Sequence, residues 1–259
     1  MITLRSHEEL LKLEEASRVV LETLDAVEKA VKPGVTTGEL DQIAEAEIRT
    51  RGARPAFVGY RGYPKTLCTS INDEVVHGIP GRRKLVAGDV VGIDCGAVLD
   101  GYFGDAARTL PVGRIDAERS RLLEATRRAL EAGIAAARPG ARVSDIGAAV
   151  EEVALVHGYG VVRDFVGHGV GTALHEEPQV PNYGPGGRGS VLKAGMVIAI
   201  EPMFNIGRAE VSVDKDGWTV RTRDKSPSAH FEYTVAIGPQ GAVILGMGRL
   251  VARAVAVGA

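Results

Sequence analysis

The stretch VVGIDCGAVLDGYFGDAARTLP, residues 90–111, contains two apolar runs separated by an Asp-Gly pair at positions 100 and 101. Asp-Gly between such runs is a strong signal for the two-residue turn of a β-hairpin. A turn at positions 100 and 101 places Gly96 opposite Asp105, with Asp94 diagonal to Asp105 on the same face. A turn at positions 99 and 100 places Asp94 directly opposite Asp105. Both registers remain open, and both bring the two carboxylates to one face, within roughly 4.5–8 Å.

Two carboxylates on neighbouring strands repel each other and are rarely buried without a partner. Asp94 lies within an apolar run, which argues against a fully solvated face. An arginine, a shared proton or a metal ion could neutralise the pair. The two aspartates alone do not choose among these, and an exposed acidic edge is a further alternative.

Four helices are expected around this hairpin, in two similar pairs. The predicted ranges are about 6–32, 36–52, 116–138 and 144–158. Ser6 with Glu9 forms a capping box at the first helix, and Pro33-Gly34 ends it, as Pro139-Gly140 ends the third. We therefore predict one domain, residues 1–259, with two similar α/β halves, about 1–112 and 113–259. Two copies are too few for a solenoid.

Strand-like segments follow each helix pair. They include residues 90–93, 102–103, 196–200 and 231–237. Glycine and proline are dense between positions 178 and 189, which predicts an exposed loop. The apolar, alanine-rich tail from position 246 is expected to pack rather than to anchor the chain.

The composition excludes several classes of protein. With 45% apolar residues the chain can bury a substantial core, and a net charge of −2 does not suggest a nucleic-acid partner. Two cysteines, Cys68 and Cys95, cannot form a disulfide framework or a zinc ribbon, which favours a reduced, cytoplasmic chain. We expect neither a membrane span nor a signal peptide.

The second half contains three further candidates for a polar centre. His168 is framed by three glycines in GHGVG, residues 167–171, so that backbone and ring can approach a centre closely. Glu201 follows an apolar run and Glu232 lies in a strand-like segment, and a buried ionised group at either place needs a partner. Standing alone, His168 would be read as a loop histidine.

Together these residues form a candidate set of metal ligands: Asp94, Asp105, His168, Glu201 and Glu232. The charges of four carboxylates would be balanced by two divalent cations. Oxygen-rich ligation with one histidine suits Mn²⁺, Fe²⁺, Co²⁺ or Zn²⁺. Such a centre favours hydrolysis, in which a metal-activated water attacks a peptide carbonyl and a neighbouring carboxylate takes the proton.

The motifs resemble those of the type I methionine aminopeptidases, in the short form typical of bacteria. NDEVVHGIP, residues 72–80, resembles the family's N-E-x-x-x-H-G-I-P stretch. GHGVG at 167–171 with HEEP at 175–178 matches its G-H-G-x-G…H-E-x-P pattern. The five candidate ligands match the family's own, and the segment between Glu201 and Glu232 is too short for the helical insertion of type II relatives.

The resemblance implies the pita-bread fold, in which two pseudo-symmetric α/β halves share a central antiparallel sheet covered by helices. It also implies roles at the site. Glu201 would be both a metal ligand and the general base. His77 would lie near the substrate amine and the residue after the cut, and His175 would donate a hydrogen bond to the scissile carbonyl or the tetrahedral intermediate.

By the same resemblance, a methionine pocket is expected beside the metal centre. Together with His77 and His175 it would comprise Phe57, Tyr60, Tyr63, Cys68, Leu174 and Trp218. These residue types suit a thioether, because sulfur packs well against aromatic edges. Phe57 and Val76 stand where many bacterial relatives have cysteine, and Leu174 stands where many have phenylalanine.

The implied reaction is removal of the initiator methionine from nascent proteins, with a preference for a small second residue. The expected partners are nascent N-termini and the ribosome, with no membrane and no nucleic-acid specificity, and the expected state is a monomer. Three alternatives are an Xaa-Pro aminopeptidase or prolidase on the same fold, a binding module that has lost catalysis, and a hydrolase of another substrate.

Overall fold

The computed structural model describes residues 2–248, so the expectation for the tail beyond residue 248 lies outside the described residues. The four predicted helices are present, with ends within a few residues of those expected. They are α1 (His7–Ala30), α2 (Thr37–Thr50), α3 (Ala117–Ala136) and α4 (Val143–His157). The Ser6 hydroxyl accepts from the backbone N–H of Glu9, whose carboxylate accepts from the backbone N–H of Ser6, so the expected capping box opens α1.

The strands are short except at the central hairpin. They are β1 (Arg54–Pro55), β2 (Leu67–Ile71), β3 (Glu74–Val76), β4 (Val90–Leu99), β5 (Tyr102–Pro111), β6 (Gly160–Val161), β7 (Gly167–Gly169), β8 (Glu176–Val180), β9 (Val197–Ile200), β10 (Met203–Asn205), β11 (Val211–Val213), β12 (Val220–Thr222), β13 (Ser228–His230), β14 (Glu232–Gly238) and β15 (Gly241–Ile244). A short 3-10 helix covers Tyr60–Gly62.

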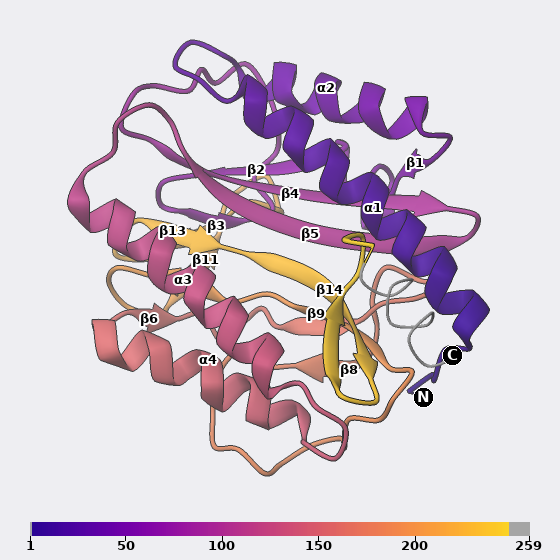
Figure 1. Cartoon of the computed structure of the whole chain (residues 1–259). Coiled ribbons are helices and arrows are strands. Elements are labelled where there is room, and N and C mark those ends of the chain that lie inside the picture. Colours follow the sequence, from indigo (N-terminus) through magenta and orange to yellow (C-terminus); the bar gives the residue numbers. More distant parts are fainter. Residues whose placement is uncertain (1, 249–259) are drawn as a thin grey trace.

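A nine-stranded sheet runs through the centre in the order β1-β4-β5-β14-β9-β7-β8 (Figure 1). Strand β2 pairs with β4, and β15 pairs with β14. Every pairing within the sheet is antiparallel. Because β5 lies next to β14, the sheet joins the hairpin of the first half of the chain directly to the last strands of the second half.

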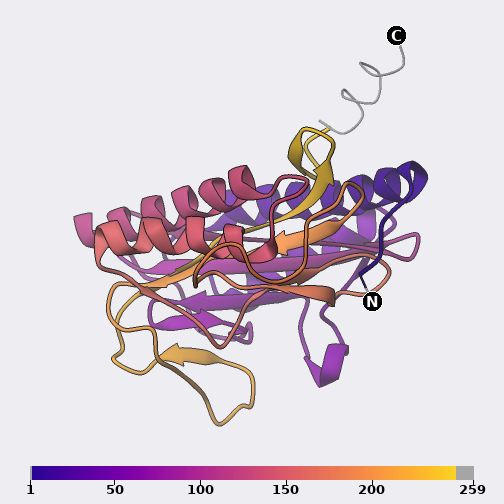
Figure 2. The same ribbon diagram turned by 90° about the horizontal axis from the view of Figure 1, so that it is seen from below.

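The helices lie together on one face of this sheet (Figure 2). Side chains alternate along β4, so that Ile93, Cys95 and Ala97 pack into the core beneath α1 and α2. A second core beneath α3 and α4 includes Leu130 and Ile146. The residues between the core positions of β4 therefore face the side away from the helices.

The hairpin has the first of the two registers considered. Gly96 pairs with Asp105, and Asp94 pairs with Ala107. On the other side of β5, Glu232 of β14 also pairs with Ala107. Asp94, Ala107 and Glu232 thus form a row across three strands, with Asp105 two residues from Ala107 on the same face.

Among the described residues, none of the helices combines the length and the apolar character needed to cross a membrane.

The contact between α1 and β5 gives a direct test of this packing. A Cβ atom on Gly104 would come within 2.7 Å of backbone atoms of Ala16 and Ser17. Gly104→Ala should therefore lower the free energy of unfolding by about 1–3 kcal/mol, because helix and hairpin must separate. Gly81→Ala is the matched control, since nothing lies within 4 Å of the added atom. Equal urea midpoints for the two variants would contradict the packing.

Candidate active site

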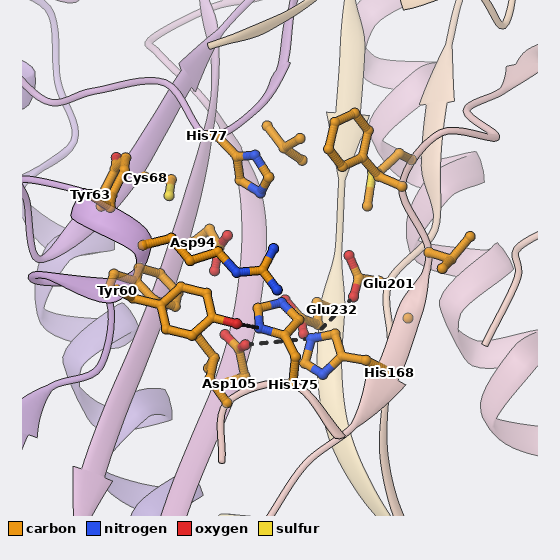
Figure 3. A pocket seen from close by; sticks show the side chains of 18 of the residues that line it. Tyr60, Tyr63, Cys68, His77, Asp94, Asp105, His168, His175, Glu201 and Glu232 are labelled. Atoms are coloured by element: carbon orange, nitrogen blue, oxygen red, sulfur yellow. Dashed lines mark hydrogen bonds and ion pairs between the residues drawn. The ribbon is translucent and has the colours of Figure 1, made fainter. Parts of the chain in front are cut away.

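A cavity of about 600 Å³ is lined by Asp94, which alternates along β4 with the core residues beneath the helices, so it lies on the other face of the sheet. It contains every residue that the sequence predicted for the site (Figure 3). These residues are Phe57, Tyr60, Tyr63, Cys68, His77, Asp94, Asp105, His168, Leu174, His175, Glu201, Trp218 and Glu232. The two halves of the chain therefore contribute to one cavity.

The four carboxylates lie on or directly after four neighbouring strands of the sheet. Asp94 and Asp105 are on the hairpin β4–β5, Glu232 begins β14, and Glu201 follows β9. Asp105, Glu201 and Glu232 are buried. Single ligand atoms of Asp105, His168 and Glu232 all lie within 4.8 Å of one another, a spacing that one metal ion could bridge.

His168 is oriented by its own loop. Its Nδ1 lies 2.9 Å from the carbonyl oxygen of Gly169. A carbonyl can only accept, so Nδ1 carries the proton and the lone pair is on Nε2. Nε2 lies 3.8 Å from Asp105 Oδ2 and 3.5 Å from Glu201 Oε1. This is the arrangement of a metal-ligating histidine whose other nitrogen is fixed by a backbone acceptor.

The four carboxylates destabilise one another in the absence of a cation. Burial raises the pKa of Asp94 to about 7. Burial, and then repulsion by the neighbouring carboxylates, also raises the pKa of Asp105, Glu201 and Glu232 well above the ordinary values. Within residues 2–248, Asp105, Glu201 and Glu232 form ion pairs with histidines only, and Asp94 forms none, so no lysine or arginine pairs with the cluster. An arginine as the neutralising partner is thereby excluded for the described part of the chain.

Several oxygens of this cluster have no hydrogen-bond partner among the described residues. They are Asp94 Oδ1, Asp105 Oδ1 and Glu232 Oε1, and all three are buried. Buried polar atoms are almost always satisfied in native proteins. A set of unpartnered carboxylate oxygens facing an oriented imidazole nitrogen fits a metal centre.

His175 lines the same cavity beside this cluster. Its Nδ1 lies 2.8 Å from the Tyr60 hydroxyl, and the two rings stack with centroids 5.2 Å apart. The ring of His168 is 4.1 Å away. Burial, and then the neighbouring His168, lowers the pKa of His175 to about 3, so the ring is neutral at pH 7.

His77 faces the same cavity from the first half of the chain. It follows β3 with a left-handed backbone, φ 61°. Its ring meets those of Phe165 and Trp218 edge to face, with centroids 5.3 and 6.3 Å apart. Burial, and then His175, lowers the pKa of His77 to about 4. His77 is therefore a neutral group that can donate or accept one hydrogen bond.

An apolar compartment adjoins the polar cluster. Phe57, Tyr63, Cys68 and Leu174 are buried in one group, against which Tyr60 and Trp218 pack. Cys68 of β2 pairs directly with Asp94 of β4, so the thiol is next to the carboxylates. The rings of Tyr63 and Trp218 meet edge to face at 5.0 Å. The six residues predicted for a methionine pocket thus form one compartment.

Phe57 closes one side of this compartment at the hairpin. A Cβ atom on Gly96 would lie 2.6 Å from Cε1 of Phe57. The aromatic ring therefore packs directly over the glycine of β4, and a larger residue at position 96 would displace it. Phe57 is 7% exposed and Leu174 is 2% exposed, so both belong to the wall of the compartment.

His230 was not predicted from the sequence. It ends β13, and its buried Nε2 lies 3.9 Å from both Glu201 Oε2 and Glu232 Oε2, without a hydrogen bond to a described residue. Its position two residues before Glu232 was a possible signal, but a strand break at residue 231 prevents an argument from alternation. Phe165, next to His77, carried no comparable signal.

The buried carboxylate–histidine cluster defines the class of the protein as a metallopeptidase, and the comparisons with known proteins agree. Residues 11–239 match the metallopeptidase family M24. A methionine aminopeptidase of Clostridium acetobutylicum is 48% identical over 246 residues, which cover 95% of this chain and 98% of the relative. Methionine aminopeptidase 1 of Bacillus subtilis is 49% identical over 245 residues, or 95% of this chain and 99% of the relative.

The crystal structure of the methionine aminopeptidase from Rickettsia prowazekii superimposes with a TM-score of 0.94 at 43% identity, covering 95% of this chain and all of that one. This confirms the predicted pita-bread fold. The chain belongs to metallopeptidase family M24 and, within it, to the methionine aminopeptidases.

The raised pKa of Asp94 predicts how stability depends on pH. A carboxyl group with a higher pKa in the folded than in the unfolded protein binds its proton more tightly when folded. In the metal-free protein, the contribution of the Asp94 carboxyl to stability is therefore lost as pH rises from the ordinary pKa of 3.8 through about 7. Buried histidines with lowered pKa act in the opposite direction, so a variant is needed to separate the two effects.

Asp94→Asn removes the carboxyl contribution of Asp94 and also its repulsion of Asp105, Glu201 and Glu232, which changes the pH dependence in the same direction. In EDTA, between about pH 5 and 7, its free energy of unfolding should fall less steeply, or rise more steeply, with pH than that of the wild type. Asp100→Asn, at the exposed turn of the same hairpin, is the control and should keep the wild-type slope. Equal slopes for wild type and Asp94→Asn would contradict the assignment of a strained buried carboxyl at position 94.

Proposed function

We propose that this protein is an aminopeptidase that removes the N-terminal methionine of proteins and prefers a small second residue. One observation carries the proposal: a single cavity joins the buried carboxylate–histidine cluster to an apolar compartment of aromatic, thiol and leucine side chains. The first part suits hydrolysis at a metal centre. The second suits a thioether side chain, because sulfur packs favourably against aromatic rings.

The ligands we propose for two divalent cations are Asp94, Asp105, His168, Glu201 and Glu232. Their unpartnered buried oxygens and the Nε2 lone pair of His168 support this assignment. Mn²⁺, Fe²⁺, Co²⁺ and Zn²⁺ all suit such a donor set. When bound, these cations polarise the scissile carbonyl and supply a nucleophile from water at neutral pH.

Glu201 is proposed as the general base as well as a ligand. It follows β9, with Oε1 at 3.5 Å from His168 Nε2 and Oε2 at 3.9 Å from His230 Nε2. A carboxylate there can take a proton from the attacking water and return it to the leaving amine.

The two neutral histidines are proposed to bind the peptide around the cut. If the Tyr60 hydroxyl donates to Nδ1 of His175, then Nε2 of His175 carries the proton and can donate to the scissile carbonyl. His77, which lines the same cavity, is proposed to bind the substrate amine and the residue after the cut. Both histidines are neutral at pH 7, since burial lowers the pKa of His175 to about 3 and that of His77 to about 4.

The methionine side chain is proposed to enter the compartment of Phe57, Tyr60, Tyr63, Cys68, Leu174 and Trp218. The Tyr63 hydroxyl lies 2.9 Å from the carbonyl of Leu67 and 3.0 Å from that of Gly78, which holds the ring in place. Because this wall of the compartment is rigid, it favours a flexible, unbranched side chain such as that of methionine, which can adapt to the shape of the compartment. We extend the proposal to a monomer that acts on nascent chains in the cytoplasm, at the ribosome.

Peptide hydrolysis tests the proposal against its alternatives. Metal-stripped protein should be inactive on Met-Ala-Ser, and Mn²⁺ or Co²⁺ should restore release of methionine. Leu-Ala-Ser, Met-Lys-Ser and Ala-Pro-Ala should be cleaved poorly. Cleavage of Ala-Pro-Ala instead would favour an Xaa-Pro aminopeptidase. Restored cleavage of another peptide would mean a different substrate. No cleavage despite bound metal would favour a binding module.

A substitution at His175 tests its proposed role. His175→Ala should lower kcat for Met-Ala-Ser by about 10²–10³, the effect of one lost donor to the oxyanion, with KM little changed. Tyr60→Phe removes only the hydroxyl partner of Nδ1 and should cause a smaller loss. An effect of His175→Ala confined to KM would mean that the ring binds substrate and transition state equally.

A further inference from the structure

The segment that precedes α1 reaches from the helix layer to the loop 171–176, which carries the cavity residues Leu174, His175 and Glu176. From the N-terminal end of α1, this segment extends past the edge of the sheet (Figure 2). The backbone N–H of Arg5 donates to the carbonyl of Gly195 at 2.8 Å, which fixes the segment just before β9. The Arg5 side chain is only 5% exposed, so its guanidinium is buried at this junction.

The buried guanidinium is neutralised by a residue of the second half. Its Nη2 donates to the Glu176 carboxylate at Oε2, and its Nη1 lies 3.5 Å from Glu9 Oε1. A Cβ atom on Gly171 would lie 1.8 Å from Arg5 Nη2. Arg5 therefore occupies the space beside Gly171, packed directly against the backbone of the loop 171–176.

The other oxygen of Glu176 holds that loop from within. Oε1 accepts from the backbone N–H groups of Thr172, at 2.9 Å, and Ala173, at 3.2 Å. The next two residues, Leu174 and His175, line the cavity. The other end of the loop is attached to β5, since the carbonyl of Gly171 accepts from Phe103 at 2.9 Å.

We infer that Arg5 is a positioning residue for the aminopeptidase reaction, which it serves by holding Glu176 and, through Glu176, the loop that directs Leu174 and His175 into the cavity. The inference rests on the proposed function. Without Arg5, the Glu176 carboxylate loses its charge partner and turns toward water, and the loop N–H groups lose their acceptor. A shift of about 1 Å in a catalytic group can cost on the order of 10²-fold in rate.

The structure separates this effect from metal binding. The polar contacts of Arg5 go to Glu9, Glu176 and Gly195, none of which belongs to the five proposed ligands. Loss of Arg5 should therefore change turnover and leave metal affinity unchanged. A merely destabilising substitution would not produce that split.

The test compares Arg5→Gln, Arg5→Lys and the control Arg49→Gln, which removes an arginine that is 63% exposed and pairs with Glu45 on α2. Each variant is measured for kcat and KM on Met-Ala-Ser, for the Kd of Mn²⁺ by calorimetry, and for Tm. We expect kcat of Arg5→Gln to fall at least about tenfold. Its Kd for Mn²⁺ should stay within about threefold, below the 10–100-fold typical of a lost outer ligand contact.

Arg5→Lys keeps the charge and should recover part of kcat, and Arg49→Gln should match the wild type. If Arg5→Gln does not fold, the inference is tested with Arg5→Lys and Glu176→Gln instead. Glu176→Gln keeps an oxygen for the loop N–H groups but loses the charge pair with Arg5. Both variants should then have a lower kcat than the wild type.

Wild-type kcat in Arg5→Gln, or in both substitute variants, would overturn the inference, as would a loss of Mn²⁺ affinity equal to the loss of kcat. Failure of the wild-type protein itself to release methionine would instead contradict the proposed function.

Discussion

The burial of four carboxylates in one cavity, together with their mutual repulsion, is the constraint on which the rest of the structure depends. Burial alone raises the pKa of Asp94 to about 7, and its neighbours raise one another further. Such a cluster is compatible with a stable fold only when protons or cations neutralise it. A nearby imidazole whose free nitrogen faces the acids, and carboxylate oxygens without partners, favour cations.

The sheet concentrates these charges without exposing the core to them. Alternation along β4 sends Ile93 and Cys95 to the helices and Asp94 to the cavity. The pairing of β5 with β14 then brings ligands from both halves of the chain onto three adjacent strands. The same face carries Cys68 beside Asp94, so the apolar compartment begins where the acidic cluster ends. The acidic cluster and the apolar compartment therefore lie next to each other on one face of the sheet.

Local patterns predicted the hairpin and the helices, because turn residues and capping boxes act over a few positions. The register stayed open until the backbone showed left-handed φ at Asp100 (49°) and Gly101 (82°), the geometry of a two-residue turn. The five candidate metal ligands were predicted from hairpin geometry and sequence context, whereas the pocket residues and the roles of His77 and His175 followed from resemblance. His230 and the Arg5–Glu176 pair depend on contacts between distant segments, which no local pattern shows. The boundary between halves near residue 112 stays a prediction.

The central claim is that the acidic cluster is a metal centre, and its most direct test is anomalous diffraction from crystals grown with Mn²⁺. The account predicts anomalous density bounded by Asp94, Asp105, His168, Glu201 and Glu232, and its loss in Asp94→Asn or His168→Ala. Density only elsewhere, or none at a Mn²⁺ concentration that supports methionine release, would contradict it.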